Sequence, residues 1–344
     1  MAEKKRIEYI DLAKGICILM VVLVHVVPEF GEKSSFLSCV RMPLYFCLSG
    51  LFYKDYGSLK NFFCKKINKI LIPFVAWYFI GYAIYYAGRI VLSSSSDATF
   101  SLNDIFYSNE IFNLPIWFLL CLFWCNVLFV IVQCFFKKWY LQISAVFFIS
   151  MTGWAMSFFD VFNLFYIGSS MTCLPFFYIG YQLRQTGFLY KDLKNSHSFF
   201  IMCISLMLAL LIALVPDSPP RLNYYKNEII YGNLLLIYIC SSAFVVGVLM
   251  LCKMIGSVPF VSWIGRYSII VLVSHMWMRD LVKTAIDLSF GNALDILLLE
   301  VLTFIVVMLL MTIFIPFCRQ YLPYITAQKD IFEIREKIGG YKMV

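Results

Sequence analysis

The sequence has few charged residues. Only 14% of its 344 residues are Asp, Glu, Lys or Arg, whereas 62% are hydrophobic. Soluble domains carry about 25% charged and about 45–50% apolar residues. A water-soluble fold cannot bury so much apolar surface, because surface-to-volume scaling limits its core. The composition therefore excludes an ordinary soluble protein and predicts a protein whose solvent is the lipid bilayer.

The sequence also lacks the marks of other classes. No small-residue cleavage site follows the first apolar run, 12–27, and Lys14 and His25 interrupt that run, so we interpret it as a retained span rather than a signal peptide. The twelve cysteines lie mostly inside apolar runs and form no CxxC pair or Cys/His ligand cluster. We therefore expect packing thiols and no metal site.

Long apolar runs, bounded by polar or proline-containing stretches, predict an all-α fold, a polytopic transmembrane helical bundle of about ten spans. We expect residues 1–326 to form the transmembrane domain and residues 327–344 a short cytoplasmic tail, with a surface helix over 327–342. The predicted spans lie near 11–29, 39–53, 70–92, 114–136, 139–158, 161–183, 198–215, 232–252, 267–286 and 293–318.

The distribution of basic residues predicts the orientation of the chain. If the loops alternate from the N-terminus, about 21 of the 28 Lys and Arg residues fall on one side, which is typical of the cytoplasmic side. Both termini are therefore expected in the cytoplasm. Lysines beside anionic lipid account for the net charge of +8, so the charge requires no nucleic-acid partner.

Ionisable groups inside spans are costly and therefore informative. Lys14 and His25 are eleven residues apart in the first span, about 16 Å along one face of a helix, and Asp11 lies on that side. Arg41 opens the second span from the outer side, and His275 lies near mid-membrane in the ninth. We expect these groups to line a polar interior and to converge in the outer half of the membrane.

Each group also has a purely structural interpretation. Lys14 can extend its amine to lipid phosphates, Arg41 can anchor an interface, and Trp117 can belong to the interfacial aromatic belt. His275 can be a buried histidine that bonds to a neighbouring backbone. His25 is harder to explain in this way, since it stands among Val and Leu.

Five segments, taken together in their order and spacing, resemble the motifs of the membrane acyltransferase 3 family, whose members resemble sugar O-acetyltransferases. They are Asp11-Leu12-Ala13-Lys14-Gly15-Ile16 with His25, Arg41-Met42-Pro43 through Gly50, Lys66-Ile67-Asn68-Lys69 before Leu71-Ile72-Pro73, Pro115-Ile116-Trp117-Phe118-Leu119, and Ile264-Gly265-Arg266-Tyr267-Ser268 with His275.

The chain departs from the family pattern at several positions. Lys14 stands where the family often has Arg, and Lys66 and Lys69 stand where it usually has Arg-x-x-Arg. Lysine is a point charge and does not grip a phosphate bidentately as arginine does. Arg41 stands where the sugar-acetylating branch often has His, which bears on the contact with the acceptor.

The resemblance implies acyl transfer in a bacterial inner (plasma) membrane, typically of acetyl, from cytoplasmic acetyl-CoA to a hydroxyl. The acceptor would be a cell-surface sugar or a lipid-linked glycan. Lys14, Lys66 and Lys69 would hold the phosphates of the acyl-CoA electrostatically. The donor is a substrate, and no permanently bound cofactor is expected.

The resemblance also assigns roles near the outer side. His25 would act as general base on the acceptor hydroxyl, or would accept the acetyl group itself. Arg41 or the Trp117 indole would stabilise the tetrahedral intermediate, and Asp11 and Trp117 would contact substrate. His275 would orient the acceptor or serve as a second acid or base.

Two interpretations from other classes stay open. A transporter or flippase for a lipid-linked glycan precursor would use the same polar interior without acyl-CoA, although no inverted repeat is evident. A purely structural partner of a cell-wall complex would leave the two histidines unexplained. The sequence leaves open the acceptor, the acyl group and the oligomeric state.

Overall fold

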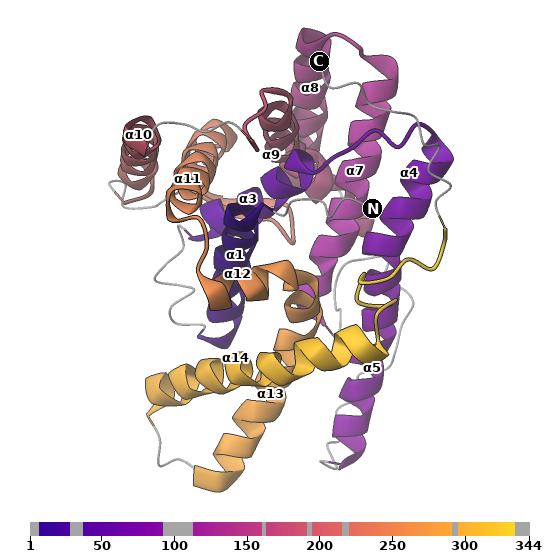
Figure 1. The fold of residues 1–344 in the computed structure, drawn as a ribbon, viewed down its shortest axis with the longest axis vertical. Coiled ribbons are helices and arrows are strands. Elements are labelled where there is room, and N and C mark those ends of the chain that lie inside the picture. Colours follow the sequence, from indigo (N-terminus) through magenta and orange to yellow (C-terminus); the bar gives the residue numbers. More distant parts are fainter. Residues whose placement is uncertain are drawn as a thin grey trace.

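The computed structural model describes residues 7–27, 37–91, 113–159, 163–190, 195–214, 220–290 and 295–333. Helices dominate this part of the chain (Figure 1), as expected from the long apolar runs. In chain order they are α1 (Glu8–Val26), α3 (Ser38–Leu51), α4 (Leu59–Lys66), η2 (Ile67–Leu71), α5 (Ile72–Val91), η3 (Leu114–Ile116), α7 (Trp117–Phe135), α8 (Trp139–Phe158), η4 (Leu164–Tyr166), α9 (Ile167–Gln185), α10 (Asn195–Leu214), α11 (Leu234–Ile255), α12 (Pro259–Arg266), α13 (Ser268–Phe290) and α14 (Ile296–Tyr321).

The all-α prediction is confirmed, and a helix lies at each of the ten predicted spans. The helix α3 has 14 residues, and α13 carries Arg279, Asp280 and Lys283, so the number of crossings stays a prediction. Seven stretches in the described residues are long and apolar enough to cross a membrane: Glu8–Val26, Leu59–Gly88, Leu114–Phe135, Trp139–Phe158, Ser196–Leu214, Leu234–Ile255 and Ile296–Tyr321.

Helix α1 packs against α3, α11, α12, α13 and α14. Its contact with α12 depends on two glycines from the motif segments. A Cβ atom at Gly15 would lie 2.0 Å from the Val261 carbonyl oxygen, and one at Gly265 would lie 1.9 Å from the Asp11 carbonyl oxygen. Small residues allow such close backbone approach between membrane helices. The sequence motifs around Lys14 and Arg266 therefore fix one helix against another.

Two interruptions divide helices near motif segments of the sequence. The π-helix η2 joins α4 to α5 and contains Asn68 and Lys69, and π-turns often occur at functional sites. The second interruption lies at Tyr267, between α12 and α13. It places the short helix α12 beside the first half of α1 and leaves α13 free to carry His275 toward the other end of α1.

A β-hairpin, which no sequence pattern predicted, connects the region after α10 to α11. Strand β1 (Arg221–Asn223) pairs antiparallel with β2 (Glu228–Tyr231), with a register shift between Arg221 and Leu222. Asn163 donates to the Tyr225 carbonyl at 3.2 Å, and Asn227 donates to the Gly153 carbonyl at 2.8 Å. The hairpin is thus tied to the end of α8 and to the residues just before α9.

The C-terminal segment, residues 322–333, does not form the predicted surface helix. Residues 327–333 adopt turns and bends, and the rest of 327–342 lies outside the described residues. The segment returns alongside α4 and α5 (Figure 1), where the Trp77 indole donates to the Ile325 carbonyl at 3.1 Å. Its backbone thereby gains partners from other helices, which explains why it need not be helical.

Candidate active site

The two histidines singled out in the sequence meet in the structure. His25 lies near the end of α1 and His275 lies in the second turn of α13, and His25 Nδ1 is 3.0 Å from His275 Nε2. The ring planes differ by 22°, which permits an in-plane N–H···N bond. His275 is fully buried, and His25 is half-buried. Two residues 250 positions apart in the sequence therefore form a directly contacting histidine pair.

A backbone carbonyl fixes the direction of this hydrogen bond. His275 Nδ1 lies 2.9 Å from the Val271 carbonyl oxygen, which can only accept, so Nδ1 carries the proton. The neutral His275 then has a lone pair at Nε2, and His25 must donate to it from Nδ1. This assignment leaves the lone pair of His25 on Nε2, the nitrogen that faces away from His275.

Two arginines flank the pair. Arg279, one turn after His275, donates from NH1 to the His25 carbonyl at 2.9 Å, and it also bonds Asp280. Arg41 is held by its carbonyl, which accepts from the Cys17 thiol at 2.8 Å. Both guanidinium groups act electrostatically on the His25 ring. The structure therefore brings His25 and His275 together and anchors Arg41 on the helix that carries His25.

Trp117 does not belong to an aromatic belt facing lipid, because only 8% of it is exposed. Its indole packs against the rings of Tyr166 and Tyr225, with centroids 5.8 and 5.9 Å apart. The neighbouring Asn113 is also buried and donates to the Val273 carbonyl at 2.6 Å, two residues before His275. Trp117 thus forms part of the buried wall between α7, α13 and the hairpin.

At the other end of α1, the acid of the first motif pairs with the arginine of the last one. Arg266 Nε is 3.5 Å from Asp11 Oδ2, and the Asp11 side chain is nearly buried. Asp11 is 14 residues from His25, about 21 Å along the helix, so the two cannot contact the same hydroxyl. Lys14 lies with its amine 4.7 Å from the centroid of the Phe52 ring. These contacts give Asp11 and Lys14 partners at the predicted cytoplasmic end.

The lysines of the third motif have different surroundings. The amine of Lys66 lies 5.8 Å from the ring centroids of Tyr53, Tyr56 and Phe62, an arrangement that attracts a cation. Lys69 instead pairs with Asp330 at 2.9 Å and donates to the Ala327 carbonyl at 2.6 Å. Of the two lysines expected to bind the donor, one is therefore engaged by the C-terminal segment.

The C-terminal segment is bound around Asn68, a residue between those lysines. Its amide donates to the Phe332 carbonyl at 2.7 Å and accepts from the Ile331 and Phe332 amides. Lys65 adds an ion pair with Asp330 at 2.8 Å. Burial alone would raise the pKa of Asp330, but hydrogen bonds from Lys65 and Lys69 hold this pKa below its usual value.

Three of these residues escaped the sequence reasoning, for different reasons. Arg279 follows His275 by four residues, so helical spacing could have placed both on one face. Asn68 lies inside the third motif, but the motif does not show that its side chain is buried, with only 1% exposed. Arg221 begins the unpredicted hairpin beside Pro220, whose carbonyl oxygen lies 3.1 Å from the Cys39 thiol of α3, and no local pattern connects it to Arg41.

The profile of an acyltransferase domain, that of the acyltransferase 3 family, matches residues 7–318, nearly the whole chain. The chain belongs to this family. Comparison with curated proteins and with solved structures gives no match. The expected family membership is therefore confirmed, and with it membrane acyltransferase activity. The matched range includes both histidines and the third-motif lysines, whereas the C-terminal segment lies beyond it.

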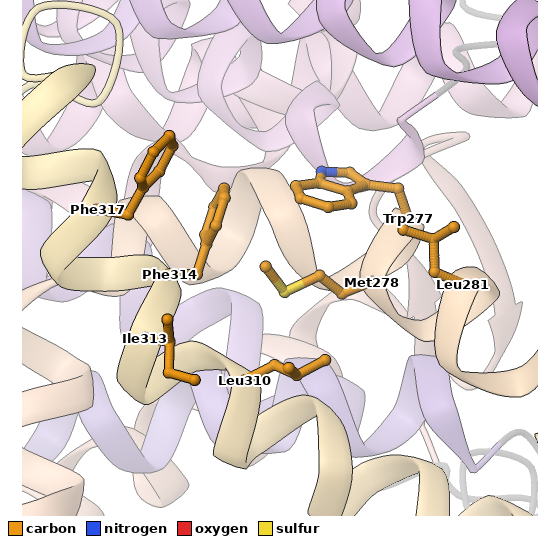
Figure 2. A pocket seen from close by; sticks show the side chains of 7 residues that line it. All are labelled: Trp277, Met278, Leu281, Leu310, Ile313, Phe314 and Phe317. Atoms are coloured by element: carbon orange, nitrogen blue, oxygen red, sulfur yellow. The ribbon is translucent and has the colours of Figure 1, made fainter. Parts of the chain in front are cut away.

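An apolar groove of about 390 Å³ lies between α13 and α14 in this acyltransferase (Figure 2). Trp277, Met278 and Leu281 form one wall, and α14 contributes the other wall with side chains that include Phe314 and Phe317. A groove without polar groups suits hydrocarbon chains and offers nothing to hold a charged or hydroxylated substrate. We therefore place the chemistry at the histidine pair.

Proposed function

We propose that this acyltransferase moves an acetyl group from cytoplasmic acetyl-CoA to a hydroxyl of a cell-surface sugar or lipid-linked glycan, across the inner membrane of a bacterium. The contact between His25 and His275 carries the proposal. It supplies a neutral imidazole with an accepting Nε2, which is the group that a weakly acidic sugar hydroxyl needs. Family membership supplies the reaction class.

The assigned tautomers support a simple sequence of proton movements. His25 Nε2 takes the proton of the acceptor hydroxyl while the oxygen attacks the thioester carbonyl. The tetrahedral intermediate then breaks its C–S bond, and the proton passes from His25 to the leaving sulfur, giving the ester and free CoA. The His25 imidazolium keeps its Nδ1–H bond to His275 throughout, so His275 acts as a positioning residue.

The positive charges near His25 suit the intermediate. Negative charge develops on the thioester oxygen, and fixed positive groups in a water-poor setting stabilise such charge strongly. Arg41 and Arg279 both act electrostatically on the His25 ring, so their field extends over the reacting atoms. The same Nε2 lone pair would alternatively attack the thioester and form an acetyl-imidazole, which the acceptor would then open.

The donor would approach from the opposite end of α1. Lys14 and His25 are separated by about 16 Å along an unbroken helix, a distance suited to the long pantetheine arm of CoA. Lys14, Lys66 and Lys69 remain our candidates for holding its phosphates. Since Lys65 and Lys69 already contact Asp330, bound phosphates would share these lysines with that carboxylate or displace it.

The test is release of free thiol from acetyl-CoA by the purified full chain in nanodiscs, with a membrane-glycan extract as acceptor. We expect His25→Ala to lower the rate about 10²–10⁴-fold, the usual contribution of a general base. His197→Ala is the matched control, because His197 is an exposed histidine of α10 and should leave the rate unchanged.

Two outcomes would refute the proposal. Normal thiol release and glycan acetylation by His25→Ala would remove His25 from the chemistry. Glycan movement across the membrane without any thiol release would favour the transporter or flippase. Mass spectrometry of the wild type after rapid quenching separates the two mechanisms, because only the covalent route adds one acetyl group to His25.

A further inference from the structure

The β-hairpin brings a second arginine beside Arg41. The Cys39 thiol lies 3.1 Å from the Pro220 carbonyl oxygen, which fixes the start of β1 against the first turn of α3. Arg41 follows Cys39 by two residues, and Arg221 follows Pro220 directly. Both arginines are half-buried, and their charges act on one another. Two like charges are therefore held together beside α1.

Neither charge is compensated by an acid in the part of the chain that the structure describes. The ion pairs there join Lys65 and Lys69 to Asp330, Arg266 to Asp11, and Arg279 to Asp280. Arg41 and Arg221 take part in none of these ion pairs. Partly buried charge that no acid of the described residues pairs with is a candidate for binding a ligand, because ionisable groups inside membrane proteins are costly and often functional.

The position of this arginine pair relates it to the reaction. Arg41 acts electrostatically on the His25 ring, and its carbonyl is anchored to α1 by Cys17. The hairpin that carries Arg221 also places Tyr225 against Trp117. A ligand group between the two guanidinium groups would thus lie where α3 and the hairpin meet, beside the helix that carries His25, and we propose that the acceptor enters there.

We propose that Arg41 and Arg221 bind an anionic group of the acceptor, a carboxylate or a phosphate, and so select acidic or phosphate-bearing glycans. Guanidinium groups pair with both kinds of anion through two parallel hydrogen bonds. The inference rests on the proposed function, because it names the acceptor class for the same site. Arg221 selects the acceptor here, and His25 performs the proton transfer.

The experiment compares three acceptors with the full chain in nanodiscs and acetyl-CoA as donor. They are an oligosaccharide ending in glucuronic acid, its neutral methyl ester, and a polyprenyl-diphosphate-linked sugar. We expect kcat/KM to be at least ~10-fold higher for one anionic acceptor than for the ester, since each hydrogen bond to a charged group contributes on the order of 1.5–3 kcal/mol. The preferred anionic acceptor identifies the source of the charge.

Arg221→Gln should remove this preference by raising KM for the anionic acceptor, and Arg221→Lys should retain part of it. Lys226→Gln is the matched control, since Lys226 is an exposed basic residue of the same hairpin. Equal kcat/KM for charged and neutral acceptors in the wild type would overturn the inference, as would an equal loss for both in Arg221→Gln.

Binding of the glucuronic acid oligosaccharide without donor separates this inference from the proposed function. A higher unfolding temperature in its presence, lost in Arg221→Gln and retained in Lys226→Gln, supports the anion site even if no thiol is released. Absence of thiol release with every acceptor refutes the proposed function. If the wild type binds neither the glucuronic acid oligosaccharide nor the polyprenyl-diphosphate-linked sugar but acetylates the neutral ester normally, the anion site alone is refuted.

Discussion

Basic residues lie near both ends of α1, but they differ in whether an acid pairs with them. Toward the end that we predict to be cytoplasmic, Arg266 faces Asp11, and Lys65 and Lys69 share Asp330. Toward the end that we predict to face outward, Arg41 and Arg221 lie on elements that the Cys39–Pro220 contact joins, and the ion pairs among the described residues include neither arginine. The same residue types therefore serve two purposes. The paired charges connect helices and segments, whereas we propose that Arg41 and Arg221 bind a ligand.

The two ends also differ in whether their contacts can break without moving a helix. Asp330 lies on a C-terminal segment outside the helices, and its carboxylate can leave Lys65 and Lys69 without moving a helix. The outer end is built from α1, α3 and α13, with the hairpin tied to α3 through Cys39. If our proposal holds, the donor site can open and the acceptor site is already formed, which suits a reaction that crosses the membrane. The following changes test this contrast.

The largest expected effect lies at the outer end, in the histidine pair. His275→Ala removes the acceptor for the Nδ1–H of His25, so His25 loses its fixed tautomer. We expect kcat to fall about 10²-fold, less than for His25→Ala. His275→Gln should recover part of the rate, because its amide oxygen can accept the same hydrogen bond. Thiol release from acetyl-CoA measures both variants.

A double variant checks that the histidines act as one unit. Residues of one catalytic unit show strongly non-additive effects. The double variant His25→Ala with His275→Ala should therefore be no slower than His25→Ala alone. A loss equal to the product of the two single effects would show that His275 acts independently of His25, for example on the acceptor.

The next effect lies at the cytoplasmic end and concerns stability. Arg266→Ala removes a cation that pairs with the Asp11 carboxylate, whose side chain is 8% exposed. We expect a loss of about 1–3 kcal/mol in the free energy of unfolding, because a contact with a charged group contributes about that much. Thermal unfolding in detergent measures it, and Asp11→Asn combined with Arg266→Gln should restore part of the loss.

Arg319→Ala provides the comparison for this prediction. Arg319 lies 4.8 Å from the Tyr267 ring at the same helix interruption, and it is exposed. Its removal should lower stability by less than the removal of Arg266. Equal losses would mean that the arginine stems, rather than the ion pair with Asp11, stabilise the interruption between α12 and α13.

The sequence predicts the helices and the unusual ionisable residues, but it does not predict the contacts between residues far apart in the chain. The span predicted at 139–158 coincides with Trp139–Phe158, because apolar runs determine membrane helices directly. His25 and His275 stood out because ionisable groups are rare in such runs. Hydropathy has no signal for contacts such as Cys39 with Pro220, which are 181 residues apart, or Lys65 with Asp330, which are 265 apart. Those contacts decide which charges are compensated.

The smallest expected effect concerns Asp330 and the donor. Asp330→Asn removes the negative charge that Lys65 and Lys69 share. Exposed ion pairs contribute about 0.2–1 kcal/mol, so we expect KM for acetyl-CoA to fall by at most about 5-fold. Initial rates at varied acetyl-CoA measure this change. A rise in KM would instead show that Asp330 positions the lysines for the donor, and the cytoplasmic end would then be as ready for ligand as the outer end.

The pH dependence of the C-terminal segment follows from the same carboxylate. The ion pairs keep the pKa of Asp330 below its ordinary value of 3.8. A lowered pKa in the folded state stabilises the contact fully above the ordinary pKa, and the stabilisation is lost as pH falls through the lowered one. Hydrogen exchange of the Ile331 and Phe332 amides, corrected for intrinsic rates, should therefore not change between about pH 5 and pH 8. A change in that pH range would show that a titrating group other than Asp330 determines how stably the C-terminal segment is bound.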